Sequence, residues 1–217
     1  MRAGAEKGDG ILIIGGGLAA ARTAEQLRRA QFDGPITIVG AESHLPYDRP
    51  PLSKGVLHSG VDDVALKSAE FYEEKGISLR LGCAAVSVGV EARIVTLADG
   101  STLGYDQLVI ATGLVPKRIL AFPDLQGICL LRTVDDARAL RDLASSAHRA
   151  VIVGAGFIGC EVAASFRKLG LGVVLVEPQP AQGRLGRLHL AQRSWVSASG
   201  DSLPGCIARR ASMSAPG

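Results

Sequence analysis

Short apolar runs alternate with amphipathic stretches along the first 180 residues. The four residues Ile11–Ile14 are all apolar, and Gly15 stops the run. Because the run lacks polar alternation, it predicts a parallel strand that is buried on both faces. From Leu18 to Ala30 small and apolar residues recur at helical spacing, and a second strand is predicted at residues 35–39. The opening of the chain therefore predicts a βαβ unit.

The middle of the chain is more broken. Residues 41–60 contain three prolines, and Pro51 is suited to open a short helix over Leu52–Leu57. Asp99-Gly100 is a hairpin signal. The other predicted elements are a helix at Ser68–Lys75 capped by Ser68, strands at 77–81, 84–90, 93–97 and 108–111, and a helix at Asp135–Ser145.

The opening pattern returns about 139 residues later, counted from Gly15 to Gly154. A strand at 150–153, a glycine turn, a helix at 161–169 and a strand at 172–176 follow one another. This repeat indicates an α/β chain with two βαβ units. After Pro180 the pattern is lost, and we predict no fold for residues 182–217.

Composition and charge narrow the class of protein. Apolar residues make up 47% of the chain, yet no run approaches the roughly 20 residues of a membrane span. Acidic Glu6 and Asp9 near the start predict no signal peptide, so we expect a cytoplasmic protein. Residues 182–217 carry five Arg and one Asp, which leaves a balance of −1 on the rest. The body of the chain therefore predicts neither a nucleic-acid nor a membrane partner.

The four cysteines stand at 83, 129, 160 and 206. They form neither a C-x-x-C pair nor a zinc-finger spacing, so we predict no metal site. In a cytoplasmic chain they are expected to be free thiols at core positions.

The first glycine turn matches the pattern G-x-G-x-x-A. Gly15 permits the sharp turn, Gly17 lets the backbone approach a pyrophosphate, and Ala20 lets helix and strand pack closely. The helix N-terminus offers free N–H groups and a positive dipole end to phosphates. Glu42, 22 residues past Ala20, is a candidate acceptor for a ribose hydroxyl.

The second turn is a full G-x-G-x-x-G, Gly154-Ala-Gly-Phe-Ile-Gly159. Glu177 stands 18 residues after Gly159, directly after a predicted strand. Its carboxylate would accept from the adenosine ribose and repel a 2′-phosphate, which favours NAD(H) over NADP(H). Two dinucleotide sites suggest FAD plus NAD(H), hence hydride transfer between them. The predicted fold is the Rossmann-like FAD/NAD(P)-binding fold with an incomplete second domain.

Longer segments carry a family resemblance. They are His44-Leu-Pro-Tyr-Asp-Arg-Pro-Pro-Leu-Ser-Lys54, Thr102-Leu-Gly-Tyr-Asp-Gln-Leu-Val-Ile-Ala-Thr-Gly113, Leu131-Arg-Thr133 and Gly159-Cys-Glu-Val-Ala163. With both glycine turns, the chain over about residues 10–180 resembles the FAD-dependent ferredoxin reductases. This branch of the pyridine nucleotide-disulfide oxidoreductase fold includes putidaredoxin, rubredoxin and dioxygenase-system reductases. The resemblance implies an FAD segment at 8–115, part of an NAD(H) domain at 116–181 and a divergent tail at 182–217.

The resemblance also implies roles for residues. Lys54 would lie beside the flavin near N5 and pair with Glu161, and these two are the candidate catalytic residues. Either Glu42 or Ala41 would serve the ribose, since some relatives carry an acid at the place of Ala41. Val86 would contact the adenine. The other implied FAD contacts are Gly15, Gly17, Leu18, Ala19, Ala20, Arg49, Ala111, Thr112, Gly113 and Arg132, and those for NAD(H) are Gly154, Gly156, Phe157, Ile158, Gly159 and Glu177.

A redox-active Cys pair, which disulfide reductases of this fold carry, is missing from residues 42–60. The resemblance therefore implies that electrons pass from NADH through FAD to a ferredoxin-type iron–sulfur protein, without a dithiol relay.

The chain also departs from the family, because the later Gly-Asp flavin segment and the C-terminal interface domain have no counterpart in it. The abrupt loss of acids and periodicity near residue 182 leads us to hypothesise a shifted reading frame, which resequencing can test. Two alternatives stay open. One is a non-catalytic nucleotide-binding remnant, and the other is the flavin domain of an NADH oxidase or nitrite reductase.

Overall fold

The computed structural model describes residues 9–119 and 125–177. The chain divides into two compact units, Met1–Ala147 and His148–Gly217, and each is described by itself. The predicted tail at 182–217, with Cys206 and the hypothesised frame shift, lies outside the described residues.

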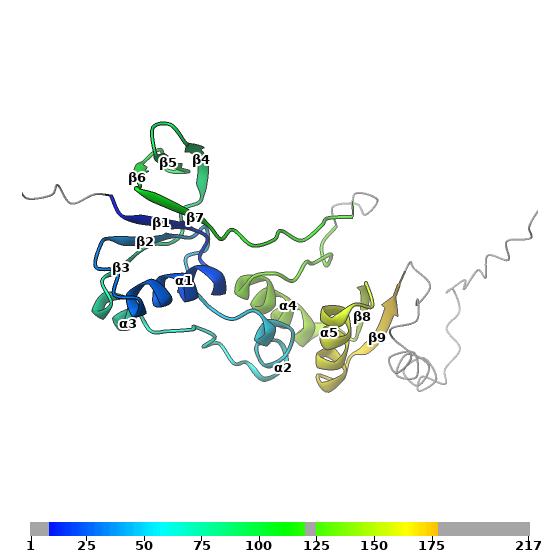
Figure 1. Cartoon of the computed structure of the whole chain (residues 1–217). Coiled ribbons are helices and arrows are strands. Elements are labelled where there is room, and N and C mark those ends of the chain that lie inside the picture. The colour runs from blue at the N-terminus through cyan, green and yellow to red at the C-terminus, as the bar shows by residue number, and fades with distance from the viewer. Residues whose placement is uncertain (1–8, 120–124, 178–217) are drawn as a thin grey trace, which may run out of the picture. The chain divides into compact units, whose positions relative to one another are not determined.

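The first unit is built on a parallel sheet of strand order β3-β2-β1-β7. Its strands are β1 (Ile11–Ile14), β2 (Ile36–Val39), β3 (Ile77–Arg80) and β7 (Gln107–Ile110). The chain runs outward from β1 through β2 to β3, and then returns to the other side of β1 as β7 (Figure 1). In open α/β sheets ligands bind beyond the carboxyl ends of the strands at such a reversal. The candidate site is therefore expected beyond Ile14.

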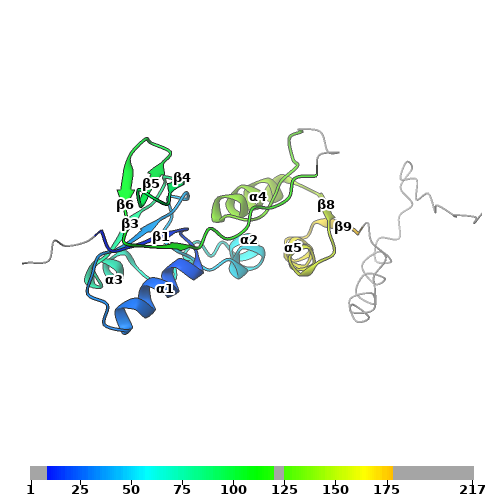
Figure 2. The ribbon, with the colours of Figure 1, turned by 45° about the horizontal axis from the view of Figure 1, so that its top comes forward.

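Both faces of this sheet are covered. Ile11 and Ile13 pack with two helices, whereas Leu12 and Ile14 pack with a small antiparallel sheet. The covering elements are α1 (Leu18–Arg29) and α3 (Ala69–Glu74) on one face and β4 (Ala85–Gly89), β5 (Ile94–Leu97) and β6 (Thr102–Gly104) on the other (Figure 2). The strand predicted to be buried on both faces is confirmed.

A separate small core lies beyond the end of β2. Its elements are the 3-10 helix η1 (Pro50–Ser53), α2 (Gly55–Ser59) and α4 (Val134–Ser146). Tyr47, Leu52 and Val56 pack there against Val134 and Ala137. This core holds α4 against the loop that follows β2.

The second unit contains a parallel pair of strands and one helix. The elements are β8 (Arg149–Val153), α5 (Phe157–Lys168) and β9 (Gly172–Val176). The strands pair from Arg149 and Gly172 to Val153 and Val176. The repeated βαβ unit predicted from the sequence is therefore present.

Two predicted helices differ from the structure. The helix predicted over Leu52–Leu57 is wrong, because η1 ends at Ser53 and α2 begins at Gly55. The amide of Lys54 donates to the carbonyl of Pro51, a three-residue spacing that tightens the turn and separates the two pieces. The helix predicted from Glu161 begins at Phe157, because the last residues of the glycine turn form its first turn.

The structure can also be compared with the predicted domain boundary and the predicted burial of the cysteines. The break in packing falls after Ala147, whereas the resemblance placed the start of the NAD(H) segment at residue 116. That assignment concerns cofactors rather than packing and stays a prediction. The described cysteines are free, as predicted, and Cys83 packs against a core cluster, but the expected core position is wrong for Cys129, which is exposed, and Cys160 is only half-buried.

Candidate functional site

The first glycine turn is held tightly between neighbouring strands. The Gly15 amide donates to the Val39 carbonyl at 2.7 Å, and the Ala111 amide donates to the Ile14 carbonyl at 2.7 Å. Gly15 has φ +122°, and a Cβ built on it would lie 2.1 Å from the Ala111 oxygen. Only glycine fits here, because both the conformation and the space exclude a side chain.

Gly17 differs from Gly15, because no atom of the described part of the chain lies within 4 Å of a Cβ built on it. Gly17 is also the N-cap of α1, which has no side-chain cap and no acid in its first turn. Helix N-termini present unpaired amides and a positive dipole end, which favour an anion. Ala20 is fully buried, as the close packing of helix and strand requires, whereas Leu18 and Ala19 are exposed.

The segment after β7 reaches the same carboxyl edge of the sheet through Arg132. Its Nη2 lies 3.3 Å from a Cβ built on Gly113, which follows Ala111 and Thr112. The Arg132 Nε is buried and has no hydrogen-bond partner within the described residues. A buried guanidinium N–H without an acceptor is costly, so this position suits an anionic or carbonyl-bearing ligand.

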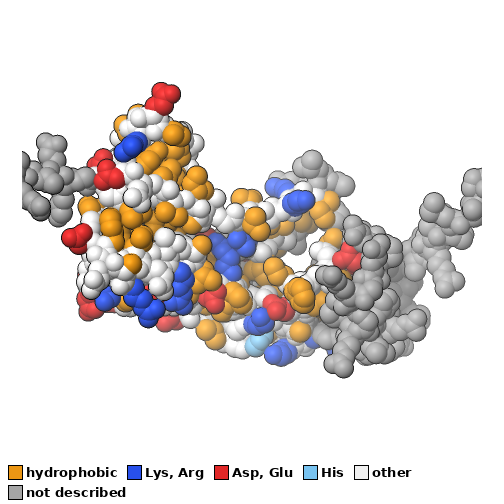
Figure 3. Space-filling model, in the orientation of Figure 1, with side chains coloured by type: hydrophobic (Ala, Val, Ile, Leu, Met, Phe, Trp, Pro, Cys, Tyr) orange, Lys and Arg blue, Asp and Glu red, His pale blue; other side chains and the backbone are white. Residues whose placement is uncertain are grey.

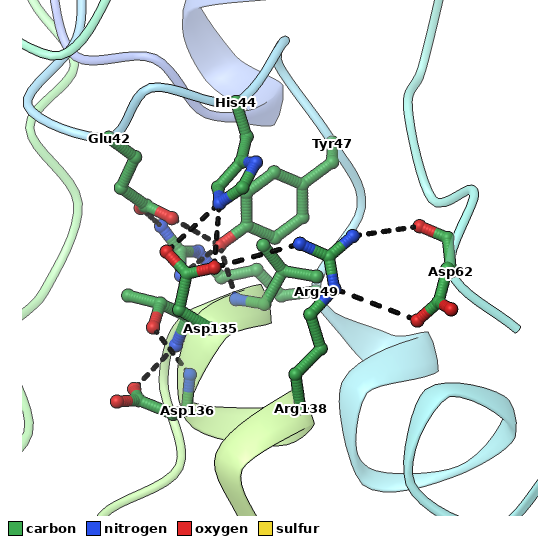
Figure 4. A network of polar contacts seen from close by, with 10 residues as sticks. Glu42, His44, Tyr47, Arg49, Asp62, Asp135, Asp136 and Arg138 are labelled. Carbon is green, nitrogen blue, oxygen red and sulfur yellow. Dashed lines mark hydrogen bonds and ion pairs between the residues drawn. The ribbon is translucent and has the colours of Figure 1, made fainter. Parts of the chain in front are cut away.

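A polar network fixes Glu42 beyond the end of β2 (Figure 4). Its Oε1 accepts from Nη2 of Arg49 at 2.9 Å, and its Oε2 accepts from the Tyr47 hydroxyl at 2.5 Å. That hydroxyl also accepts from the Val134 amide at 3.0 Å. Arg49 reaches the Arg132 carbonyl through its Nη1. The two donors leave the Glu42 carboxylate with lone pairs for a further ligand.

Helix α4 contrasts with α1 at its N-terminus. Thr133 accepts from the Asp136 amide, and the Asp136 carboxylate accepts from the Thr133 amide, so a capping box is complete. The Tyr47 hydroxyl satisfies the Val134 amide as well. Because side chains of the chain itself fill this helix end, α4 has no anion site comparable to that of α1.

Three other predicted residues of the first unit are exposed. Lys54 is exposed at the junction of η1 and α2, and Ala41 is exposed beside Glu42. Val86 lies on β4 with 62% of its surface exposed. Hydrophobic side chains gather over the small sheet (Figure 3). The predicted partner of Lys54, Glu161, belongs to the second unit, so their pairing stays a prediction.

The second glycine turn repeats the geometry of the first. Gly154 has φ +106°, and its amide donates to the Val176 carbonyl at 2.7 Å. Gly156 is the uncapped N-cap of α5, and no described atom lies within 4 Å of a Cβ built on it. A Cβ on Gly159 would lie 1.9 Å from the Gly154 oxygen, so helix and turn pack too closely for a side chain. Phe157 and Ile158 are exposed at the start of the helix.

The acids of the two units do not occupy equivalent places. Val39 pairs with the end of β1 as Val176 pairs with the end of β8, so Gly40 corresponds to Glu177. The Glu177 carboxylate accepts from the Ala155 amide at 2.8 Å. In the first unit a Cβ on Gly40 would lie 3.3 Å from the Gly16 Cα, which leaves little room for a side chain. The first acid therefore comes two residues later, at Glu42.

Of the two residues that fix Glu42, Arg49 was predicted as an FAD contact, whereas sequence reasoning missed Tyr47. Tyr47 stands inside the segment that carried the resemblance, but nothing in its local pattern indicates a partner 87 residues away. The Thr133-x-x-Asp136 capping box is different, because a Ser or Thr followed three residues later by an acid is a recognisable helix start.

Thiol, metal and membrane chemistry find little support in the described residues. Burial, with a smaller effect of nearby Glu161, raises the pKa of the Cys160 thiol, which makes its thiolate less available. Within residues 9–119 and 125–177, no three His, Cys, Asp or Glu side chains are grouped to hold a metal ion. No helix in these ranges is long and apolar enough to cross a membrane.

Comparison with known proteins finds similar ferredoxin reductases. The chlorobenzene dioxygenase ferredoxin reductase component of a Cupriavidus strain is 46% identical over 170 residues, which are 77% of this chain and 41% of that protein. The benzene 1,2-dioxygenase system ferredoxin–NAD(+) reductase subunit of Pseudomonas putida is 42% identical over the same shares. The crystal structure of the ferredoxin reductase for the CYP199A2 system from Rhodopseudomonas palustris matches with a TM-score of 0.80 and 36% identity, over 86% of this chain and 48% of that one.

The chain thus spans about two fifths of the length of these curated relatives. The family model described as pyridine nucleotide-disulphide oxidoreductase matches residues 9–186, which include both glycine turns. The cofactors of this family are FAD and NAD(H). The chain belongs to the pyridine nucleotide-disulphide oxidoreductase family, and its sequence is similar to the ferredoxin reductases of that family.

Proposed function

We propose that this chain supplies the cofactor-binding segments of an NADH-dependent reductase that passes electrons to a ferredoxin-type iron–sulfur protein. The first unit binds FAD and the second binds NAD(H). One observation carries the proposal: two glycine turns stand at the carboxyl ends of parallel strands, and each opens a helix whose N-terminus has no side-chain cap. The N-terminus of α4, which a capping box fills, shows by contrast how a helix end of the same chain looks when side chains satisfy its amides.

The residues of the first unit fit FAD on three counts. The space beside Gly17 admits a pyrophosphate close to the backbone of α1. The unpartnered Nε of Arg132 is a donor in need of an acceptor, and a flavin cofactor carries ring carbonyls, hydroxyls and phosphates. The Glu42 carboxylate is fixed by two donors and retains lone pairs for a ribose hydroxyl.

The second unit fits NAD(H) by its charge. The Ala155 amide holds the Glu177 carboxylate beside the glycine turn. A carboxylate there accepts from a ribose 2′-OH and repels a 2′-phosphate. This arrangement supports NADH over NADPH as the electron donor.

The chemistry of the reaction belongs to the cofactor. Bound FAD supplies a hydride acceptor for reduced nicotinamide and a donor of single electrons. The part we assign to Lys54 is to hold a positive charge beside the flavin ring, and the part assigned to Glu161 is to orient that ammonium group. A nearby cation favours an anionic ring, so this pair would set the flavin potential.

The names of the relatives support the electron acceptor that we propose. The curated relatives are called ferredoxin reductases of dioxygenase systems, and a solved putidaredoxin reductase–putidaredoxin complex matches 78% of this chain at 33% identity. An iron–sulfur protein is therefore the electron acceptor we propose. A cytoplasmic location is part of the same proposal, and neither nucleic acid nor a membrane has a place in it.

Retention of flavin by the full chain tests the proposal. The purified chain is incubated with FAD, desalted and examined by visible absorbance, and then NADH or NADPH is added without oxygen. We expect a flavin band in near-stoichiometric amount that NADH bleaches faster than NADPH does. A folded sample that retains no flavin would contradict the FAD site. Retained flavin that NADH does not bleach would contradict the reductase function and favour a nucleotide-binding protein without turnover.

A further inference from the structure

The Tyr47 hydroxyl joins two segments that are distant in the sequence. Tyr47 is only 4% exposed, and it belongs to the small core beyond β2. Its hydroxyl donates to Oε2 of Glu42 at 2.5 Å and accepts from the Val134 amide at 3.0 Å. One group thus links the acid that follows β2 to the first residue of α4 (Figure 4).

The Tyr47 hydroxyl has defined donor and acceptor roles in these two hydrogen bonds. Burial, and then the hydrogen bond to Glu42, raise the pKa of Tyr47 to about 12. At neutral pH the hydroxyl therefore keeps its proton. Its proton points at the carboxylate, and its lone pair faces the amide.

Arg49 makes a second connection between the same two segments. Its guanidinium bonds the Glu42 carboxylate and the Arg132 carbonyl, and it lies over the Tyr47 ring at 5.4 Å from the ring centre. Arg132 in turn reaches Gly113 beyond β7. These contacts run from the end of β2, through the start of α4, to the end of β7, so they form a rim along the carboxyl edge of the sheet.

Another tie between the same segments is weaker. His44 Nε2 contacts the Asp135 carboxylate at 2.8 Å, but the Asp135 side chain is 65% exposed. Exposed pairs contribute little, whereas hydrogen bonds from a buried hydroxyl to a charged group are costly to lose. The buried hydroxyl of Tyr47 is therefore a stronger link than the exposed His44–Asp135 pair.

We propose that Tyr47 is a positioning residue of the FAD site: its hydroxyl couples the Glu42 carboxylate to the first turn of α4 and so holds the rim preformed before the cofactor binds. This inference rests on the proposed function for the identity of the cofactor. The coupling between the two segments does not depend on it.

The test uses Tyr47→Phe in the full chain, with Tyr72→Phe as its matched control. Tyr72 is a second buried tyrosine of the same unit, 1% exposed, whose hydroxyl has no hydrogen-bond partner within the described residues. Amide exchange of residues 132–137 is measured without FAD. Fluorescence titration then gives the affinity for FAD and for FMN, which lacks the adenosine half of FAD.

We expect Tyr47→Phe to speed exchange at Val134 several-fold without FAD and to weaken FAD about tenfold, as loss of a hydrogen bond to a charged group implies. FMN affinity should change less than about twofold, since Glu42 faces the ribose of the adenosine half in the proposed site. Tyr72→Phe should change none of these. In a chain that already carries Tyr47→Phe, Glu42→Ala should weaken FAD less than it does in the unaltered chain.

Three results would overturn the inference. Unchanged exchange at Val134 would show that the hydroxyl does not couple the segments. Equal losses of FAD and FMN affinity, or equal effects of Tyr47→Phe and Tyr72→Phe, would show a general effect on the fold. If the unaltered chain binds no FAD, the proposed function fails for this chain, and exchange at Val134 alone decides the coupling.

Discussion

Gly17 offers a substitution that should separate stability from cofactor binding. Its backbone is extended, with φ −101° and ψ −168°, so any residue can adopt its conformation. A side chain placed there meets no described atom within 4 Å. Asp is among the preferred N-cap residues, and its carboxylate can accept from amides of the first turn of α1. We therefore predict that Gly17→Asp stabilises the cofactor-free chain.

The two effects have opposite signs and can be estimated. A better cap contributes a few tenths of a kcal/mol, and removal of glycine from a compatible position contributes about 0.4–1 kcal/mol. We expect the free energy of unfolding to rise by about 1 kcal/mol. In the proposed complex the same amides would bond phosphate, and each charge-assisted bond is worth about 1.5–3 kcal/mol. Loss of two such bonds should raise the Kd for FAD at least about a hundredfold.

Urea unfolding without FAD and flavin titration measure the two effects in one sample. Gly156→Asp is the matched control, because Gly156 is the uncapped N-cap of α5 in the second unit. It should weaken NADH and leave FAD affinity unchanged. Unchanged FAD affinity in a folded Gly17→Asp chain would refute the placement of phosphate at α1. A fall in stability would refute the capping argument.

Three other substitutions test separate parts of the structure. Glu177→Arg should shift the ratio of NADH to NADPH affinity at least about tenfold toward NADPH, and an unchanged ratio would remove Glu177 from the ribose site. Arg28 donates to four backbone carbonyls at 2.6–2.8 Å, so Arg28→Lys should cost about 2 kcal/mol in urea unfolding, against less than about 0.5 for Arg29→Lys at its exposed neighbour. The folded-state pKa of Tyr47, about 12, lies above the usual 10, so its stabilisation is complete below pH 10 and is lost as pH rises toward 12. The stability difference from Tyr47→Phe should shrink over that range, and a constant difference would contradict the assigned protonation.

Local sequence patterns predicted the strands and turns whose structure depends on neighbouring residues. The run Ile11–Ile14 has no polar alternation, and it is buried between two layers. Asp99-Gly100 predicted a hairpin turn, and that turn joins β5 to β6. Where two local tendencies compete, prediction was poorer. Leu52–Leu57 has helical spacing, yet the chain tightens after Pro51 and restarts at Gly55.

The sequence predicted only those parts of the site that follow from the spacing of residues along the chain. The two glycine turns and the acids beyond them follow from distances along the chain. The link from Tyr47 to Val134 spans 87 residues and depends on α4 packing against the loop after β2. No pattern within either segment contains that information, so the role of Tyr47 could not be found from the sequence, although Arg49 was predicted as an FAD contact.

The comparison of the two units explains why one acid needs such a link and the other does not. Glu177 follows its strand directly, and a single local bond from the Ala155 amide orients its carboxylate. At the equivalent place in the first unit a side chain on Gly40 would crowd the Gly16 backbone and the Leu81 side chain. The acid is therefore displaced to Glu42, in a loop that no strand pairing orients. Its donors, Tyr47 and Arg49, come from the same loop, and Tyr47 is itself held by packing against α4 and by the Val134 amide. The close approach at Gly40 thus accounts for an acid on a loop, and the contact of Tyr47 with α4 ties that loop to a distant helix.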